Sequence, residues 1–271
     1  MRRGTRIAIG VVWACLGLAA SARAGLTRQE VKDLFAQANQ AFRTANTEAD
    51  PEVQQQLYET AILKYERVIR EGAVHNARLY YNLANAHLLK GDLGRAILNY
   101  RRAERIDSDD VNIQKNLAFA RTRRLDTIPI KTEQQVLRTL LFWHYDFSLK
   151  TRLRVACLAF AAVCLGLTAM VWRGRSSPVI ATASIAGLIL VCTAISVMVE
   201  VRQQQGTICG VITAGQVVAR QGDGPNYPES FKAPLHPGTE FELIERRPGW
   251  LHIQLTDGSE GWIPNEAGET L

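Results

Sequence analysis

The sequence has few cysteines, few charged residues and none of the short motifs that mark common enzyme classes. Five cysteines in 271 residues, without a paired-cysteine spacing, exclude a disulfide scaffold and a cysteine-rich metal site. Only 21% of the residues are charged and 47% are hydrophobic, which excludes an intrinsically disordered chain. The phosphate loop, the nucleophile elbow of hydrolases and the H-E-x-x-H zinc motif are missing. We therefore expect no catalytic residues, no cofactor and no metal.

The excess of positive charge belongs to one end of the chain. The formal net charge is +6, but residues 1–24 carry Arg2, Arg3, Arg6 and Arg23 and no acid. Without these four arginines, 28 basic residues face 26 acidic residues, which is close to balance. A basic patch that binds nucleic acid would need clustered excess charge in a folded domain. The composition thus predicts no nucleic-acid partner.

Residues 1–24 have the pattern of a secretory signal peptide. A basic start is followed by an apolar run at 7–20 and by small residues at Ala22 and Ala24, as signal peptidase requires. The mature chain would then begin at Gly25. The alternative is an uncleaved N-terminal anchor, and either version exports the segment that follows.

Two later apolar stretches predict a transmembrane hairpin. Residues 155–172 and 179–199 contain no charged side chain, and each would form a helix about 27 to 31 Å long, enough to cross a bilayer. The predicted signal peptide would place both soluble parts on the periplasmic side of a bacterial inner membrane. The turn between the spans, with Arg173 and Arg175, would then lie in the cytoplasm, as the positive-inside rule prefers. The alternative is a pair of buried helices in a soluble protein.

Aromatic and small residues support the hairpin. Ala162 and Gly166 in the first stretch, and Ala183 and Gly187 in the second, would let two helices pack closely. Aromatic rings favour the membrane interface. Four of them lie just before the first stretch: Phe142, Trp143, Tyr145 and Phe147.

The segment from Gly25 to about Ile130 is predicted to be helical, because its apolar residues recur at spacings of three and four. Residues 77–110 match the 34-residue tetratricopeptide pattern, with two helices joined by a turn at 91–92. A looser repeat precedes it, with a longer interhelical loop around Asp50-Pro51. Another first helix follows it without a clear partner. We expect a short solenoid of about two and a half repeats.

The first helices of such a solenoid would line a concave groove. Asparagine amides both donate and accept, so they can pair with the backbone of an extended peptide. The alternative for Asn82 and Asn116 is that they brace neighbouring repeats. The candidate groove residues are Asn39, Tyr81, Asn82, Asn85, Asn112 and Asn116.

Two arginine runs lie within the helical segment. Most such runs are solvated helix faces, and the alternative is an electrostatic contact with an acidic partner or with anionic headgroups. The runs consist of Arg101, Arg102 and Arg105, and of Arg121, Arg123 and Arg124.

From Gly206 onward, turn residues separate short runs of β-forming residues, which predicts a small β-barrel. The order of the glycine, proline and tryptophan motifs resembles that of bacterial SH3 domains, which often bind peptidoglycan or peptides. Trp250 and Trp262 alternate like core aromatics, with ligand stacking as the alternative. Tyr227 and Phe231, in the long loop, are the candidate contacts.

The whole arrangement resembles the tetratricopeptide protein of the Bacteroides aerotolerance (Bat) operons. The motifs that carry this resemblance are FAQAN at 35–39, YNLAN at 81–85, GDLGRAILNY at 91–100 and the terminal SH3-like block. The resemblance implies a noncatalytic membrane partner of von Willebrand A-domain proteins and of a MoxR-type AAA+ ATPase, linked to stress tolerance or envelope protein maturation. If the soluble parts are exported, the ATPase contact would be indirect, through the A-domain protein.

The sequence therefore predicts a membrane-anchored scaffold for protein partners. The runner-up is a peptidoglycan-binding adaptor that recruits cell-wall enzymes. The expected parts are a signal peptide at 1–24, a tetratricopeptide solenoid at 25–130, a linker at 131–152, transmembrane helices at 153–172 and 179–201 around a cytoplasmic loop at 173–178, and an SH3 barrel at 206–271.

Overall fold

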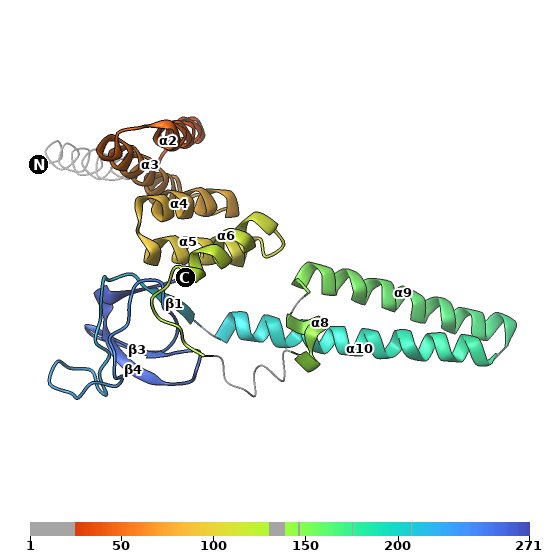
Figure 1. The fold of residues 1–271 in the computed structure, drawn as a ribbon. Helices are drawn as coiled ribbons and strands as arrows, with labels where there is room; N and C mark the ends of the chain where they lie inside the picture. Colours follow the sequence, from red (N-terminus) through yellow and green to blue (C-terminus); the bar gives the residue numbers. More distant parts are fainter. Residues whose placement is uncertain (1–24, 130–138, 146, 175, 207) are drawn as a thin grey trace, which may run out of the picture. The chain divides into compact units, whose positions relative to one another are not determined.

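The computed structural model describes residues 25–129, 139–145, 147–174, 176–206 and 208–271 (Figure 1). The predicted signal peptide and much of the predicted linker lie outside these residues. The described chain is mostly helical, with one small antiparallel sheet. It divides between His75 and Asn76 into two compact units.

The first unit is a pair of long packed helices, α2 (Arg28–Thr47) and α3 (Pro51–Gly72). Thr27 caps α2 in a capping box with Glu30. Asp50 caps α3 and Pro51 occupies its first turn, where proline's missing N–H costs nothing. The predicted long interhelical loop is wrong, because only residues 48–50 connect the two helices. The extra residues lengthen the helices instead.

The second unit begins with three helices, α4 (Ala77–Lys90), α5 (Leu93–Ile106) and α6 (Val111–Thr122). Gly91, at φ +92°, ends α4 in the left-handed conformation that favours glycine. Asp92 then caps α5, so the turn lies at the predicted position. The helices pack through Ala84, Ala96 and Tyr100, all fully buried.

Next come a short helix, α8 (Phe142–Tyr145), and two long ones, α9 (Leu149–Arg173) and α10 (Ser177–Gly206). The last two pack side by side as a hairpin (Figure 1) and are long and apolar enough to span a membrane. Most of their side chains are exposed, unlike the core helices of a soluble protein. A methyl group on Gly166 would lie 2.9 Å from Ala183, as close packing requires, whereas Gly187 faces open space.

The chain ends in five antiparallel strands in the order β4-β3-β2-β1-β5. Their core is formed by apolar side chains such as Ile212, Leu251 and Ile263. The strands are β1 (Ile208–Ile212), β2 (Glu240–Arg247), β3 (Trp250–Gln254), β4 (Glu260–Pro264) and β5 (Gly268–Thr270), with a short 3-10 helix η1 (Asn265–Ala267) before β5.

The sheet is not closed into the predicted barrel. The β-forming run at 217–220, between β1 and β2, predicts a strand, but Val217 and Arg220 make only isolated bridges in the structure. The segment between β1 and β2 contains four prolines, which have no N–H for a ladder, and four glycines, which weaken strands. It therefore covers the sheet as a long loop.

Candidate functional site

Asn39, the candidate groove residue in the first unit, braces its two helices. Its side-chain oxygen accepts a hydrogen bond of 2.6 Å from the hydroxyl of Tyr65 in α3. The rings of Tyr65 and Phe35 lie 5.9 Å apart in the same layer. The role of Asn39 in the structure is therefore to satisfy a buried hydroxyl at the seam of α2 and α3.

In the second unit, Asn85 and Asn116 belong to a polar network between α4, α5 and α6. The Asn116 amide donates to the Tyr81 hydroxyl and to Asn85 Oδ1, both at 3.0 Å, and the Tyr100 hydroxyl also donates to Asn85. Burial raises the pKa of Tyr100, and neighbouring Tyr81 raises it further, so the hydroxyl remains a donor. The bracing alternative is thus the observed arrangement for Asn116, and Asn85 shares it.

Three candidate groove residues instead line a surface hollow of about 360 Å³ between the N-terminal parts of α4 and α6. The network just described holds the Tyr81 hydroxyl, while Asn82 and Asn112 add their amides to the wall. The complete lining is Ala77, Arg78, Tyr81, Asn82, Asp107, Asp110, Asn112 and Ile113.

The hollow offers neutral hydrogen-bonding groups beside the charged side chains of Arg78, Asp107 and Asp110. Asp110 caps α6 through the backbone N–H groups of Asn112 and Ile113. Asp107 accepts a hydrogen bond of 2.7 Å from Lys150, which lowers the pKa of the Asp107 carboxyl. Because both carboxylates already have partners, the amides and the Tyr81 ring are the groups best placed to bind a polar segment.

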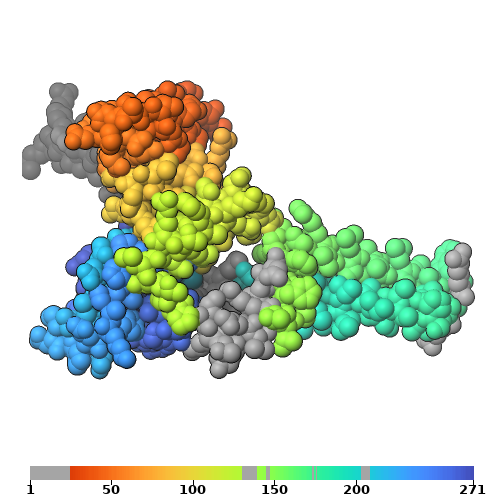
Figure 2. Space-filling model, viewed as in Figure 1, coloured from red at the N-terminus to blue at the C-terminus, as the bar shows by residue number. Residues whose placement is uncertain are grey.

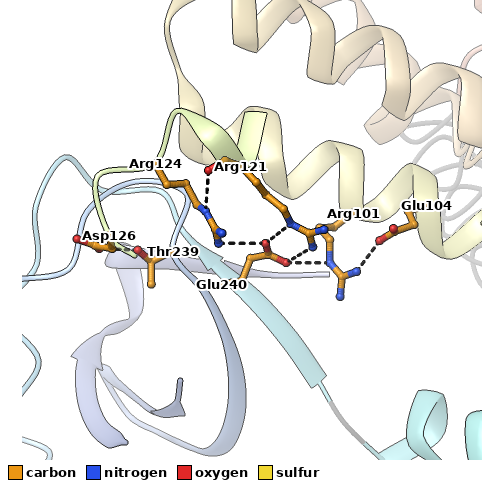
Figure 3. Close-up of polar contacts among 7 residues, drawn as sticks. All are labelled: Arg101, Glu104, Arg121, Arg124, Asp126, Thr239 and Glu240. Atoms are coloured by element: carbon orange, nitrogen blue, oxygen red, sulfur yellow. Dashed lines mark hydrogen bonds and ion pairs between the residues drawn. The ribbon is translucent and has the colours of Figure 1, made fainter. Parts of the chain in front are cut away.

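A second polar centre lies between the helices and the sheet, where three arginines converge on Glu240 at the start of β2 (Figure 3). Arg121 binds this carboxylate in a bidentate manner, with both N–O distances 2.7 Å. Arg124 Nη1 lies 3.4 Å and Arg101 Nε 3.3 Å from its oxygens. Only 17% of the Glu240 side chain is exposed. We call these four residues the Glu240 cluster.

Electrostatics stabilise the ionised form of Glu240. Burial raises its pKa, but the hydrogen bond from Arg121 and the charges of Arg121, Arg101 and Arg124 outweigh burial, so the pKa is lowered. The predicted basic runs therefore meet an acidic partner within the same chain. Arg102 makes a further contact, donating to the Thr270 carbonyl at 3.0 Å.

Asp126, in the segment after α6, forms a second contact with the sheet region. Its carboxylate accepts from the backbone N–H of His236 at 2.7 Å and from the Thr239 hydroxyl at 2.6 Å. Burial raises the pKa of Asp126, but these bonds and His236 outweigh burial and lower it. In Figure 2 the yellow-green atoms that follow α6 lie against the blue atoms of the sheet region.

Close apolar packing accompanies these ionic contacts. Val211 of β1 belongs to the same buried cluster as Ile97 and Tyr100 of α5. A methyl group on Gly94 of α5 would lie 2.7 Å from the backbone oxygen of Ile212, so only glycine fits there without movement. The helices α4–α6 and the sheet therefore share one packed interface.

The two candidate contacts in the long loop differ in exposure. Tyr227 is 49% exposed, and its backbone is held by Arg220, which donates to the Tyr227 carbonyl at 2.8 Å. Phe231 is partly buried and packs against the core of the sheet, so its predicted exposure is wrong. Its aromatic ring fills space under the loop, where burial of apolar area is favourable.

Trp262 has little surface left for a ligand. Its side chain is 7% exposed, with His252 stacked on it at 4.6 Å and the Arg247 guanidinium 4.6 Å from the ring centroid. The core assignment of Trp262 is therefore favoured over ligand stacking.

Sequence reasoning missed Glu240, Asp126 and Arg152 as partners. Glu240 and Arg121 are separated by 119 positions, so no local pattern links them. The two arginine runs were an available signal, but an acidic partner was only the alternative to a solvated helix face in their interpretation.

No protein-family model matches the chain, and no curated protein matches it.

Proposed function

We propose that this protein is a noncatalytic scaffold, anchored in the membrane by the α9–α10 hairpin, that binds an extended polar segment of a protein partner. Three features support the proposal. The hairpin α4–α5 coincides with the tetratricopeptide pattern at 77–110, the strands follow the order of the SH3-like motifs, and α9 and α10 have the length and composition of membrane spans. The partner is a von Willebrand A-domain membrane protein, as the Bat resemblance implies, and it relays to a MoxR-type ATPase.

The observation that carries the proposal is the hollow formed by Tyr81, Asn82 and Asn112. The Asn116 amide, which also donates to Asn85, donates to the Tyr81 hydroxyl, so this group of the lining is held in place before a ligand arrives. Preorganised groups bind more tightly, because less conformational freedom is lost on binding. Amides and a phenol ring suit a peptide backbone better than a charged metabolite.

The test is crosslinking of the tagged full-length protein in intact cells, followed by mass spectrometry of the detergent-solubilised complex. We expect an A-domain membrane protein with the wild type and its loss with the double variant Asn82→Ala, Asn112→Ala. The matched control is Gln55→Ala, which removes an exposed amide from α3. Equal recovery with the double variant would exclude the hollow as the partner site.

The exposed Tyr227 favours peptidoglycan binding as a second candidate function. The loop that carries it is hydrogen-bonded at several points, including Gln221 N–H to the Pro228 carbonyl at 2.9 Å, so the ring is presented on a defined surface. Sedimentation of the full-length protein with purified sacculi, compared with Tyr227→Ala, tests it. Pelleting that depends on Tyr227 would favour the wall adaptor over the protein scaffold.

The sidedness of the scaffold rests on the predicted signal peptide. In the proposal, both soluble parts lie on the periplasmic side of the inner membrane, and the loop at 173–178 faces the cytoplasm. A membrane-impermeant thiol reagent checks this with intact cells, because it would label a cysteine introduced at Gln55 and would not label one introduced at Ser176.

A further inference from the structure

Arg152 is buried between the helices of the hairpin and bonded to three other residues. Its side chain is only 4% exposed. Its Nη2 donates to Glu200 Oε2 at 3.1 Å, and its Nη1 donates to Ser196 Oγ at 2.7 Å. The same Nη1 lies 2.9 Å from Nδ1 of His144. Arg152 thus connects α9 to α10, through Ser196 and Glu200, and to α8, through His144.

These contacts define the protonation state of His144. An arginine side chain has donors and no acceptor, so Nδ1 of His144 must accept, and the ring is neutral with its hydrogen on Nε2. The Ser196 hydroxyl, 2.7 Å from the same Nδ1, accepts from Arg152, and its own hydrogen shares the single lone pair of Nδ1 with the guanidinium. A proton on Nδ1 would point at the guanidinium and add a second positive charge beside it.

The surroundings of His144 oppose protonation. Burial lowers its pKa, the charge of Arg152 in α9 lowers it further, and Glu200 in α10 raises it by less. Among the residues that the structure describes, these two side chains are the ones whose charges shift the pKa of His144.

His144 also holds an aromatic cluster beside the hairpin. Phe142 contacts Trp143 and Phe147 edge to face, with ring centroids 5.5 and 6.2 Å apart. Phe142 and Phe147 are about half exposed. Aromatic rings at the end of a membrane span favour the interface, so their attachment to α10 fixes them at one depth relative to the hairpin.

We propose that His144, Arg152, Ser196 and Glu200 form a proton-sensitive latch, which holds the aromatic cluster against the hairpin and opens when His144 is protonated. The closed latch excludes the proton, whereas released His144 would have the ordinary pKa near 6.5. The latch is therefore fully stable above about pH 6.5 and weakens as the pH falls below it. At pH 5 the opening equilibrium would be larger than at high pH by at most roughly 30-fold, the limit in which the closed latch binds no proton.

The test is hydrogen–deuterium exchange of the full-length protein in nanodiscs, followed at the backbone amides of α8. The matched control is His144→Asn, whose amide oxygen takes the place of Nδ1 as an acceptor and does not titrate. Comparing the two proteins at the same pH cancels the intrinsic pH dependence of exchange. At pH 8 we expect the two proteins to exchange similarly in α8. At pH 5 we expect the wild type to exchange faster than His144→Asn by a factor approaching roughly 30.

A second variant keeps the test decisive. His144→Lys carries a permanent charge beside Arg152 and should exchange rapidly in α8 at both pH values. Opening that came from protonation of Glu200 would appear equally in the wild type and in His144→Asn. The proposal is overturned if those two proteins exchange alike at pH 5, or if His144→Lys exchanges like the wild type at pH 8.

Discussion

The Glu240 cluster predicts the largest single effect on the attachment of the sheet to the helices. Glu240→Gln keeps the size of the side chain and removes its charge, which leaves Arg121 and Arg124 without this carboxylate, while Arg101 keeps its ion pair with Glu104. Breaking a fully buried ion pair costs about 3 to 5 kcal/mol. Because the three arginine side chains are 28% to 34% exposed, solvent recovers part of this cost. We expect a loss of about 2 kcal/mol in the free energy of unfolding.

Urea unfolding of the full-length protein in mild detergent measures this loss, with the fluorescence of Trp250 and Trp262 reporting on the sheet. With a slope of about 2 kcal/mol per molar urea, the midpoint should fall by about 1 M. The matched control is Glu242→Gln, an exposed carboxylate two positions further along β2, which should change stability by less than about 0.5 kcal/mol. If Glu240→Gln unfolds at the same urea concentration as Glu242→Gln, the cluster does not hold the two parts together.

Two further predictions concern the same interface. Alanine at Gly94 would ordinarily stabilise a helix by about 1 kcal/mol, but contact with the Ile212 backbone should reverse the sign and cost about 1 kcal/mol in urea unfolding. Gly215→Ala, whose added methyl meets no atom within 4 Å, is the control, and a stabilised Gly94→Ala would refute the close approach. The lowered pKa of Asp126 means that it stabilises the fold above the ordinary carboxyl range near pH 4 and loses this contribution as the pH falls through its folded pKa. Asp126→Asn should therefore lose stability at pH 7 and show a shallower decline in the acid range, and an unchanged acid profile would contradict this role.

Only the folded structure shows which of the candidate asparagines brace the helices and which line the hollow. From the sequence, Asn82, Asn85, Asn112 and Asn116 all belong to one predicted groove, with bracing as the alternative for Asn82 and Asn116. Packing of α4 against α5 and α6 brings Asn85 and Asn116 together beside two tyrosine hydroxyls, because buried polar groups require partners. Asn82 and Asn112 remain at the wall of the hollow. Helical periodicity predicts which residues share one face of a helix. It does not predict which other element packs against that face.

The membrane hairpin also shows that sequence patterns do not predict contacts between residues far apart in the chain. The sequence predicts two apolar stretches without an internal charge, and Arg152 lies just outside the first of them. In the structure α9 begins earlier than the predicted span, and Arg152 is buried against Ser196 and Glu200. Hydropathy averages over a window, so it does not show which charged residues at the ends of two helices will face each other.

The sequence by itself determined the features that depend on neighbours along the chain. These are the helical segments with their caps, the turn at 91–92, the two apolar stretches and most of the strands, since periodicity, capping and hydropathy act over a few residues. Only the tertiary structure decided what depends on residues far apart in sequence. In the folded chain, the arginines of α5 and α6 bind Glu240. The sheet stays open because residues 213–239 form no continuous strand. Arg152 is buried in contact with His144. Such contacts follow from packing of the whole chain, in which each buried charge must find a partner.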